Sequence, residues 1–165
     1  MPLRTHVLHR EQRLDGTPEE VFGFFAEAKN LETITPPLLG FEVITPGAIE
    51  MQVGTLIEYR LRVHRVPVRW LTSIQAWEPP HRFVDMQVIG PYALWHHSHR
   101  FEPDGPQHTV MIDAVSYALG FGPLGELAHR LFVGRDVEQI FEHRARVIGL
   151  LLADDIRERR RAQGA

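Results

Sequence analysis

Five extended segments follow one another between residues 55 and 119 of this chain, with only short turns between them. Their breaks are rich in Pro, Gly and Asp, which are typical of hairpin turns. Connections this short force neighbouring strands to run antiparallel, because a parallel pair needs a crossover of about a dozen residues. We therefore predict an antiparallel sheet whose central strands cover residues 55–64, 68–77, 82–89, 92–101 and 108–119.

The residues before this region predict one strand, two short helices and a further short strand. Residues 7–14 alternate in character and stop at an Asp-Gly turn. Thr17 begins a helix, because Glu20 stands three residues later and the two form a capping box. A second short helix begins at Asn30 and is ended by the following pair of prolines. Residues 41–45 complete the set as a short strand.

The residues after Pro123 predict a long helix to about Arg160, with Gly134 as a point where it can kink. Helices segregated to one side of an antiparallel sheet define an α+β fold. We predict one domain over residues 1–165, in which a curved antiparallel sheet of about seven strands wraps around the C-terminal helix. Since one helix does not cover both ends of a strongly curved sheet, we also expect an internal cavity.

Composition excludes several classes of protein. The hydrophobic fraction of 44% and the charged fraction of 24% are those of an ordinary globular chain. No apolar run approaches the ~20 residues that cross a bilayer, and no secretory leader is recognisable, so we expect a cytoplasmic protein without stable membrane insertion. The absence of cysteine excludes disulfides and cysteine-ligated metals. A net charge of −3 argues against nucleic-acid binding.

Several short motifs resemble the SRPBCC superfamily, which includes START domains, birch-pollen-allergen-like proteins, polyketide cyclase/dehydrases and coenzyme Q-binding proteins. The resemblance covers nearly the whole chain and is strongest to the bacterial ligand-binding SRPBCC domain group. It implies a helix-grip fold and a cavity for a hydrophobic ligand, with no assigned reaction. The motifs are the helix start at residues 17–22, Trp-Glu-Pro-Pro at 77–80, Gly-Pro-Tyr at 90–92 and Trp-His-His-Ser-His-Arg-Phe at 95–101.

Strand alternation gathers polar and aromatic side chains on one face of the sheet. If Phe101 faces Thr109 across the hairpin, then His97 faces Asp113. Buried polar groups without partners cost about 1–3 kcal/mol each, so those on this face need one another, water or a ligand. We predict that this face lines the cavity and that the ligand-binding residues are Tyr59, Trp70, Phe83, Asp85, Gln87, Trp95, His97, His99, Asp113, Tyr117 and Phe141.

Three uses of His97, His99 and Asp113 compete. They form a structural His–carboxylate pair, a polar cluster that orients a ligand, or a two-His-one-carboxylate metal site. The leading prediction includes no metal and no cofactor, because the sequence reveals no outer partners for such ligands. The same three residues are the candidates for acid–base catalysis, although no catalytic residue is assigned.

Residues 120–125 match the Gly-x-Gly-x-x-Gly dinucleotide fingerprint. That motif works between two parallel strands, and no strand is expected after the final helix. We interpret its glycines as a tight corner between strand and helix.

The sequence thus favours binding of a small hydrophobic or amphipathic molecule, such as a lipid, quinone or polyketide, by a monomer or homodimer. The alternatives are a cyclase/dehydratase-like enzyme and an interaction module for a partner enzyme.

Overall fold

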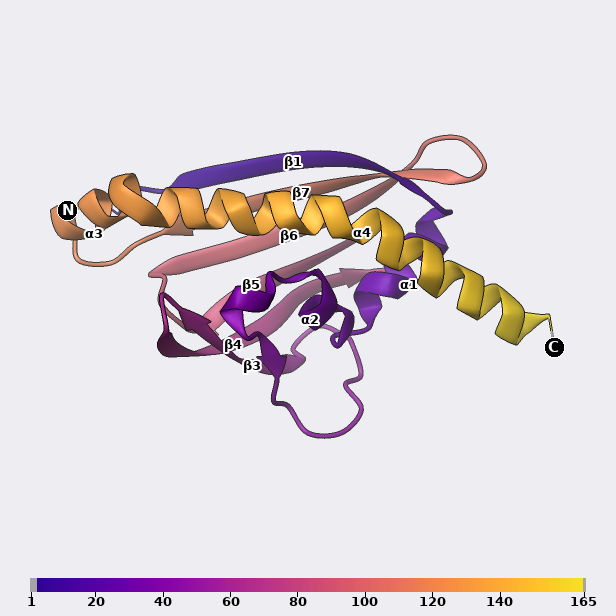
Figure 1. Cartoon of the computed structure of the whole chain (residues 1–165), viewed down its shortest axis with the longest axis horizontal. Coiled ribbons are helices and arrows are strands. Elements are labelled where there is room, and N and C mark those ends of the chain that lie inside the picture. The colour runs from indigo at the N-terminus through magenta and orange to yellow at the C-terminus, as the bar shows by residue number, and fades with distance from the viewer. Residues whose placement is uncertain (1–2, 165) are drawn as a thin grey trace.

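A seven-stranded antiparallel sheet forms the body of the protein, in the computed structural model that describes residues 3–164 (Figure 1). The strand order is β1-β7-β6-β5-β4-β3-β2, so every strand except β1 pairs with the strand that follows or precedes it in the chain. The antiparallel sheet predicted from the turns is confirmed. Its strands are β1 (His6–Asp15), β2 (Glu42–Val43), β3 (Leu56–Val63), β4 (Val66–Glu78), β5 (Arg82–Ile89), β6 (Leu94–Pro103) and β7 (His108–Ala118).

Helices occupy the connection after β1 and the C-terminal part of the chain. The capping box is confirmed, because the Thr17 side chain accepts a hydrogen bond from the Glu20 amide at 3.3 Å and the Glu20 carboxylate accepts one from the Thr17 amide at 3.0 Å. None of the described helices is long and apolar enough to span a membrane. The helical elements are α1 (Pro18–Ala26), α2 (Asn30–Ile34), the 3₁₀ turn η1 (Pro37–Leu39), α3 (Pro123–Ala128), the π-helical turn η2 (His129–Val133) and α4 (Gly134–Gln163).

The long helix is interrupted where the sequence indicated a kink, but by a π-helical turn that ends immediately before Gly134. A π turn accommodates one extra residue and bends the axis without a proline. At the corner that leads into α3, a Cβ on Gly125 would overlap the Gly120 carbonyl oxygen. These glycines therefore allow the strand and helix to meet closely, as expected, and no strand follows α4 within residues 3–164.

The predicted register between β6 and β7 is wrong by two residues. Phe101 lies opposite Met111, His99 opposite Asp113 and His97 opposite Val115. The hairpin turn is centred later than the Asp-Gly pair indicates, because the Asp104 amide donates to the His108 carbonyl at 2.9 Å. An even shift leaves every side chain on its predicted face.

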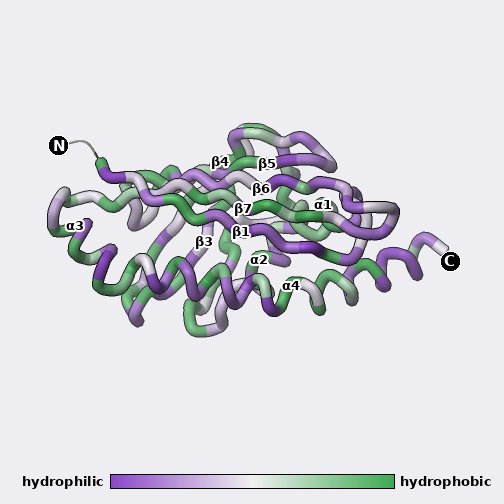
Figure 2. Tube along the Cα trace, turned by 90° about the horizontal axis from the view of Figure 1, so that it is seen from above, coloured by the Kyte–Doolittle hydropathy of each residue, from purple (hydrophilic) through white to green (hydrophobic). Residues whose placement is uncertain are grey.

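The main core lies where α1 and α4 meet the sheet. Phe22 and Phe25 of α1 contact Phe101 of β6, each with ring centroids 5.4 Å apart, and α4 adds Ile148 and Leu152. Burial of each such side chain stabilises the fold by roughly 1.5–3 kcal/mol. Hydrophobic and hydrophilic stretches alternate along α4, as expected for a helix with one buried face (Figure 2).

Helix α4 also runs beside the edge strand β1 (Figures 1 and 2). The Gln12 side-chain amide of β1 donates to the Ala145 carbonyl of α4 at 2.8 Å, and Arg10 forms an ion pair with Glu138. Strand and helix are therefore joined by polar contacts as well as by packing.

Candidate functional site

A cavity of about 1120 Å³ lies on the predicted face of the sheet. Its walls come from β3 to β6, from the segment that carries α2 and η1, and from α4. Apolar and aromatic side chains predominate, and exposed residues such as Leu38 lie at its rim. Eight predicted ligand-binding residues line this cavity, namely Tyr59, Trp70, Phe83, Asp85, Trp95, His97, His99 and Phe141.

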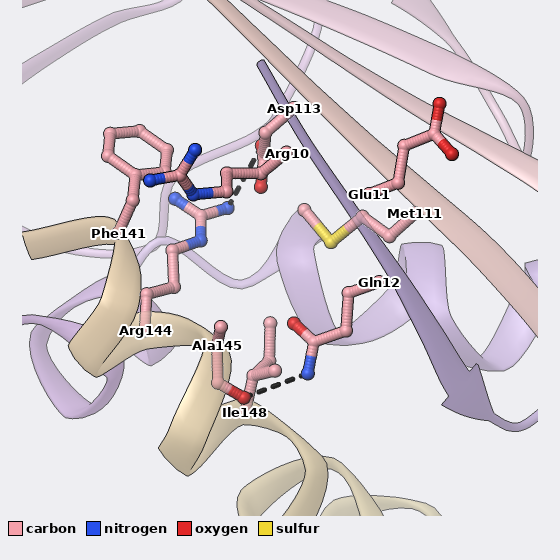
Figure 3. A pocket seen from close by; sticks show the side chains of 9 residues that line it. All are labelled: Arg10, Glu11, Gln12, Met111, Asp113, Phe141, Arg144, Ala145 and Ile148. Atoms are coloured by element: carbon pink, nitrogen blue, oxygen red, sulfur yellow. Dashed lines mark hydrogen bonds and ion pairs between the residues drawn. The ribbon is translucent and has the colours of Figure 1, made fainter. Parts of the chain in front are cut away.

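The other three predicted residues do not line it. The Gln87 side-chain amide donates to the Tyr92 carbonyl at 2.7 Å and accepts from the Tyr92 amide at 3.3 Å, so it stabilises the turn between β5 and β6. The Tyr117 hydroxyl meets the His129 ring at 2.9 Å. Asp113 borders a separate small cavity of about 40 Å³ (Figure 3). Its carboxylate also contacts His97 and His99.

Two histidines and two carboxylates form a compact cluster beside the cavity. His97 Nε2 lies 2.7 Å from Asp113 Oδ1, and His99 Nε2 lies 2.8 Å from Asp85 Oδ2. The two imidazoles lie against each other, with centroids 3.6 Å apart, and Phe83 stacks on His99 with centroids 3.9 Å apart. The predicted proximity of His97 and Asp113 is confirmed. Strand alternation had placed Asp85 on the same face as both histidines, and the structure pairs it with His99.

Burial and charge together determine how this cluster ionises. Burial lowers the pKa of His97 to about 4, with the neighbouring His99 acting in the same direction and Asp113 in the opposite one. Burial alone would raise the pKa of Asp113, but Arg144 and the two histidines outweigh it and hold that pKa well below its usual value. For Asp85, burial is likewise outweighed, chiefly by the hydrogen bond with His99, and the pKa is lowered. At neutral pH both aspartates are therefore carboxylates and His97 is neutral.

Arg144 of α4 belongs to the site, although it was not among the residues predicted from the sequence. Its side chain is 8% exposed, and its Nη2 lies 3.7 Å from Asp113 Oδ1 (Figure 3). The guanidinium carbon lies 5.2 Å from the Phe25 ring centroid, within the range of a cation–π contact. The helical spacing of Phe141, Arg144 and Ile148 was the available signal, because it places a cation within the apolar stripe of α4.

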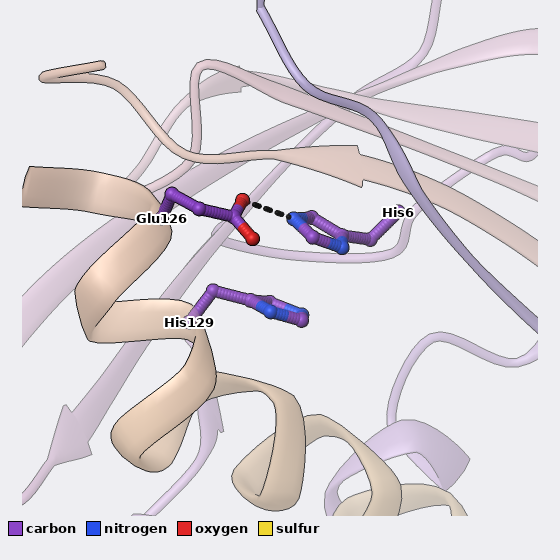
Figure 4. A group of neighbouring side chains, drawn as sticks. All are labelled: His6, Glu126 and His129. Atoms are coloured by element: carbon purple, nitrogen blue, oxygen red, sulfur yellow. Dashed lines mark hydrogen bonds and ion pairs between the residues drawn. The ribbon is translucent and has the colours of Figure 1, made fainter. Parts of the chain in front are cut away.

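A second group of histidines and a carboxylate lies where β1 meets α3 and η2 (Figure 4). His6 Nε2 is 3.2 Å from Glu126 Oε2, and the His6 and His129 rings stack with centroids 3.5 Å apart. Arg4 and Arg130 also contact the Glu126 carboxylate, at 3.2 and 3.3 Å. All three members of this outer cluster are half-buried.

Comparison with known proteins identifies the fold. No protein-family model and no curated protein sequence matches this chain. Among solved structures it is similar to TTHA0849 from Thermus thermophilus, with a TM-score of 0.65 and 19% identity over 97% of this chain and 100% of that one. It is also similar to a point mutant of norcoclaurine synthase from Thalictrum flavum in complex with a transition state analogue, with a TM-score of 0.67 and 16% identity over 93% and 98%.

A third similar structure is Ara h 8.0201, with a TM-score of 0.63 and 14% identity over 92% of this chain and 99% of that one. These identities are low, but the alignments span almost the full length of each chain. The protein therefore has the helix-grip fold, with its sheet around a long C-terminal helix, that the SRPBCC resemblance implied.

Proposed function

We propose that this protein binds a hydrophobic or amphipathic small molecule in the cavity between the sheet and α4. The cavity itself carries the proposal. Its volume of about 1120 Å³ lies slightly above the roughly 300–1,000 Å³ typical of ligand pockets. A space of this size accommodates a lipid, quinone or polyketide-like molecule rather than a single metabolite of a few atoms.

The composition of the walls defines the kind of ligand. Trp70 and Trp95 meet edge to face with centroids 5.3 Å apart, and Tyr92 packs against both. Such rings provide a large apolar contact area at low entropic cost. Asp85 and His99 supply the polar groups on the same cavity. A ligand with an apolar body and one polar end matches these walls, because its body would contact the aromatic rings and its polar end would contact Asp85 and His99.

The structural neighbours support a ligand-binding role in general terms. One norcoclaurine synthase structure holds a transition state analogue, and another holds dopamine and hydroxybenzaldehyde. The same fold thus accommodates small molecules in proteins of similar size. The identities of 14–16% support a shared fold alone, so the ligands of these neighbours do not identify the ligand of this chain.

Displacement of a fluorescent probe tests the proposal. The purified full chain is titrated with 1-anilinonaphthalene-8-sulfonate, and fatty acids, quinones and aromatic polyketides are then added as competitors. Met51→Trp places a bulky ring in the cavity wall. We expect it to weaken probe binding at least about tenfold, which corresponds to 1.4 kcal/mol.

Leu150→Trp is the matched control, since Leu150 is 75% exposed on α4 and does not line the cavity. It should leave the affinity within about twofold. If no competitor displaces the probe, and native mass spectrometry of the purified protein finds no bound compound, the proposal is wrong.

A further inference from the structure

The two imidazoles of the cluster each face a carboxylate on both sides. On the side of the large cavity, His99 Nε2 lies 2.8 Å and His97 Nδ1 lies 3.8 Å from Asp85 Oδ2. On the opposite side, His97 Nε2 lies 2.7 Å and His99 Nδ1 lies 3.2 Å from Asp113 Oδ1. Four ring nitrogens are thus divided evenly between two carboxylate oxygens.

The cluster also contains a buried nitrogen without a partner. Among residues 3–164, His99 Nδ1 has no hydrogen-bond partner, although Asp113 Oδ1 lies 3.2 Å away. A buried polar atom left without a partner is unfavourable. A cation bound to His99 Nε2 on the Asp85 side would leave the ring N–H at Nδ1, on the side of Asp113.

We propose that Asp85, His97 and His99 form a binding site for a divalent first-row transition metal such as Zn²⁺ or Fe²⁺. One ligand atom from each of the three residues lies within 4.8 Å of the others. Metal–ligand bonds of about 2.0–2.1 Å place tetrahedral ligands about 3.3 Å apart. The distances of 2.8 and 3.8 Å from Asp85 Oδ2 to the two nitrogens lie on either side of this value. Imidazole and carboxylate ligands suit these metals.

Asp113 supplies the outer partner that a metal-binding histidine needs. With the metal on His97 Nδ1 and His99 Nε2, both ring protons lie on the opposite nitrogens, which are 2.7 and 3.2 Å from Asp113 Oδ1. A carboxylate in this position fixes the tautomer and orientation of each ring. Arg144, with its Nη2 3.7 Å from Asp113 Oδ1, balances the second negative charge. Asp113 was the carboxylate ligand in the metal site predicted from the sequence, whereas the geometry assigns that role to Asp85.

The metal site opens onto the large cavity. Its biological use therefore rests on the proposed function, the binding of a ligand in that cavity. Three protein ligands leave coordination positions free on the cavity side, where a polar group of the bound molecule completes the shell.

The outer cluster is a poor competitor for metal. Its Glu126 carboxylate already contacts Arg4 and Arg130, and its His129 Nε2 contacts the Tyr117 hydroxyl.

Metal titration of the full chain tests this proposal. Protein freed of metal with a chelator is titrated with Zn²⁺ by calorimetry and with Co²⁺ by visible absorption, where three-ligand coordination gives d–d bands. We expect one Zn²⁺ per chain. Asp85→Asn, which keeps the shape of the side chain, should weaken binding at least about tenfold, and Asp113→Asn should weaken it by about 10–100-fold.

The double variant His6→Asn/His129→Asn is the control and should bind Zn²⁺ as the wild type does. Circular dichroism verifies that each variant is folded. If a cluster variant does not fold, anomalous scattering at the zinc edge from wild-type crystals decides the question, with a peak expected between Asp85, His97 and His99.

A wild-type protein that binds no Zn²⁺ or Co²⁺, or a loss of binding only in the control, overturns the metal site. Probe displacement from metal-free protein is measured in parallel. Retained displacement then shows that the metal site has failed while the ligand-binding proposal stands.

Discussion

The inner cluster (Asp85, His97, His99, Asp113) and the outer cluster (His6, Glu126, His129) use the same residue types in different surroundings. The inner histidines, His97 and His99, are 5% and 4% exposed. The outer residues are half-buried, and two exposed arginines share the Glu126 carboxylate with His6. Water and the exposed arginines therefore compensate the outer charges, whereas the inner charges depend on one another.

This difference has an energetic consequence. Removing one partner from a buried ionic cluster leaves an uncompensated charge and costs several kcal/mol, whereas exposed ion pairs contribute about 0–1 kcal/mol. The losses in the free energy of unfolding caused by matched substitutions in the two clusters therefore show how much burial contributes. Three predictions test the comparison.

The largest effect is expected at the carboxylate that the inner cluster shares. Asp113→Ala leaves Arg144 and both histidines without their common partner, and should lower the free energy of unfolding by about 3–5 kcal/mol. Urea denaturation followed by fluorescence measures it. Glu126→Ala is the matched change in the outer cluster and should cost at most about 1 kcal/mol. Equal losses at the two positions would show that burial does not distinguish the clusters.

A smaller loss is expected when the buried cation is replaced. Arg144→Met keeps much of the length of the side chain but removes the charge next to Asp113. We expect a loss of only about 1–3 kcal/mol, because the Nε and Nη2 of Arg144 have no hydrogen-bond partner among residues 3–164 and their burial is itself unfavourable. The exposed Arg146→Met on the same helix should change stability by less than about 0.5 kcal/mol. An Arg144→Met variant more stable than wild type would contradict the assigned role of this cation.

The smallest effect concerns the pH dependence of the outer cluster. Burial, together with the adjacent His6, lowers the pKa of His129 below its ordinary value of 6.5. The unfolded chain therefore takes up a proton at this residue more readily than the folded chain does. The resulting stability is fully present above pH 6.5 and is lost as the pH falls towards the folded pKa.

His129→Asn removes this contribution. Thermal melts from about pH 7.5 to about pH 5 should therefore show a smaller decrease in Tm for the variant than for the wild type. Parallel curves would mean that His129 titrates as an ordinary surface histidine.

Local sequence signals predicted most of the fold but only part of the site. Thr17 and Glu20 are only three residues apart, so their capping box could be recognised from the sequence. Strand alternation also correctly placed His97 and His99 on the cavity face. The register between β6 and β7 could not be predicted from the sequence, because the geometry of the hairpin turn shifts the pairing by two residues. The contact of Arg144 with Asp113 depends on how α4 crosses the sheet, which no local pattern encodes.

The contact between α4 and β1 has a consequence for self-association. An edge strand presents unpaired amides and carbonyls that invite another chain to extend the sheet. Here the ten-residue edge strand β1 is accompanied by α4 and held to it through Gln12, while the opposite edge, β2, is only two residues long. The longer edge is thus partly occupied by α4, and the other edge is short. We therefore expect that two copies of this chain do not join by continuing one sheet into the next, and that a homodimer, if one forms, uses another surface.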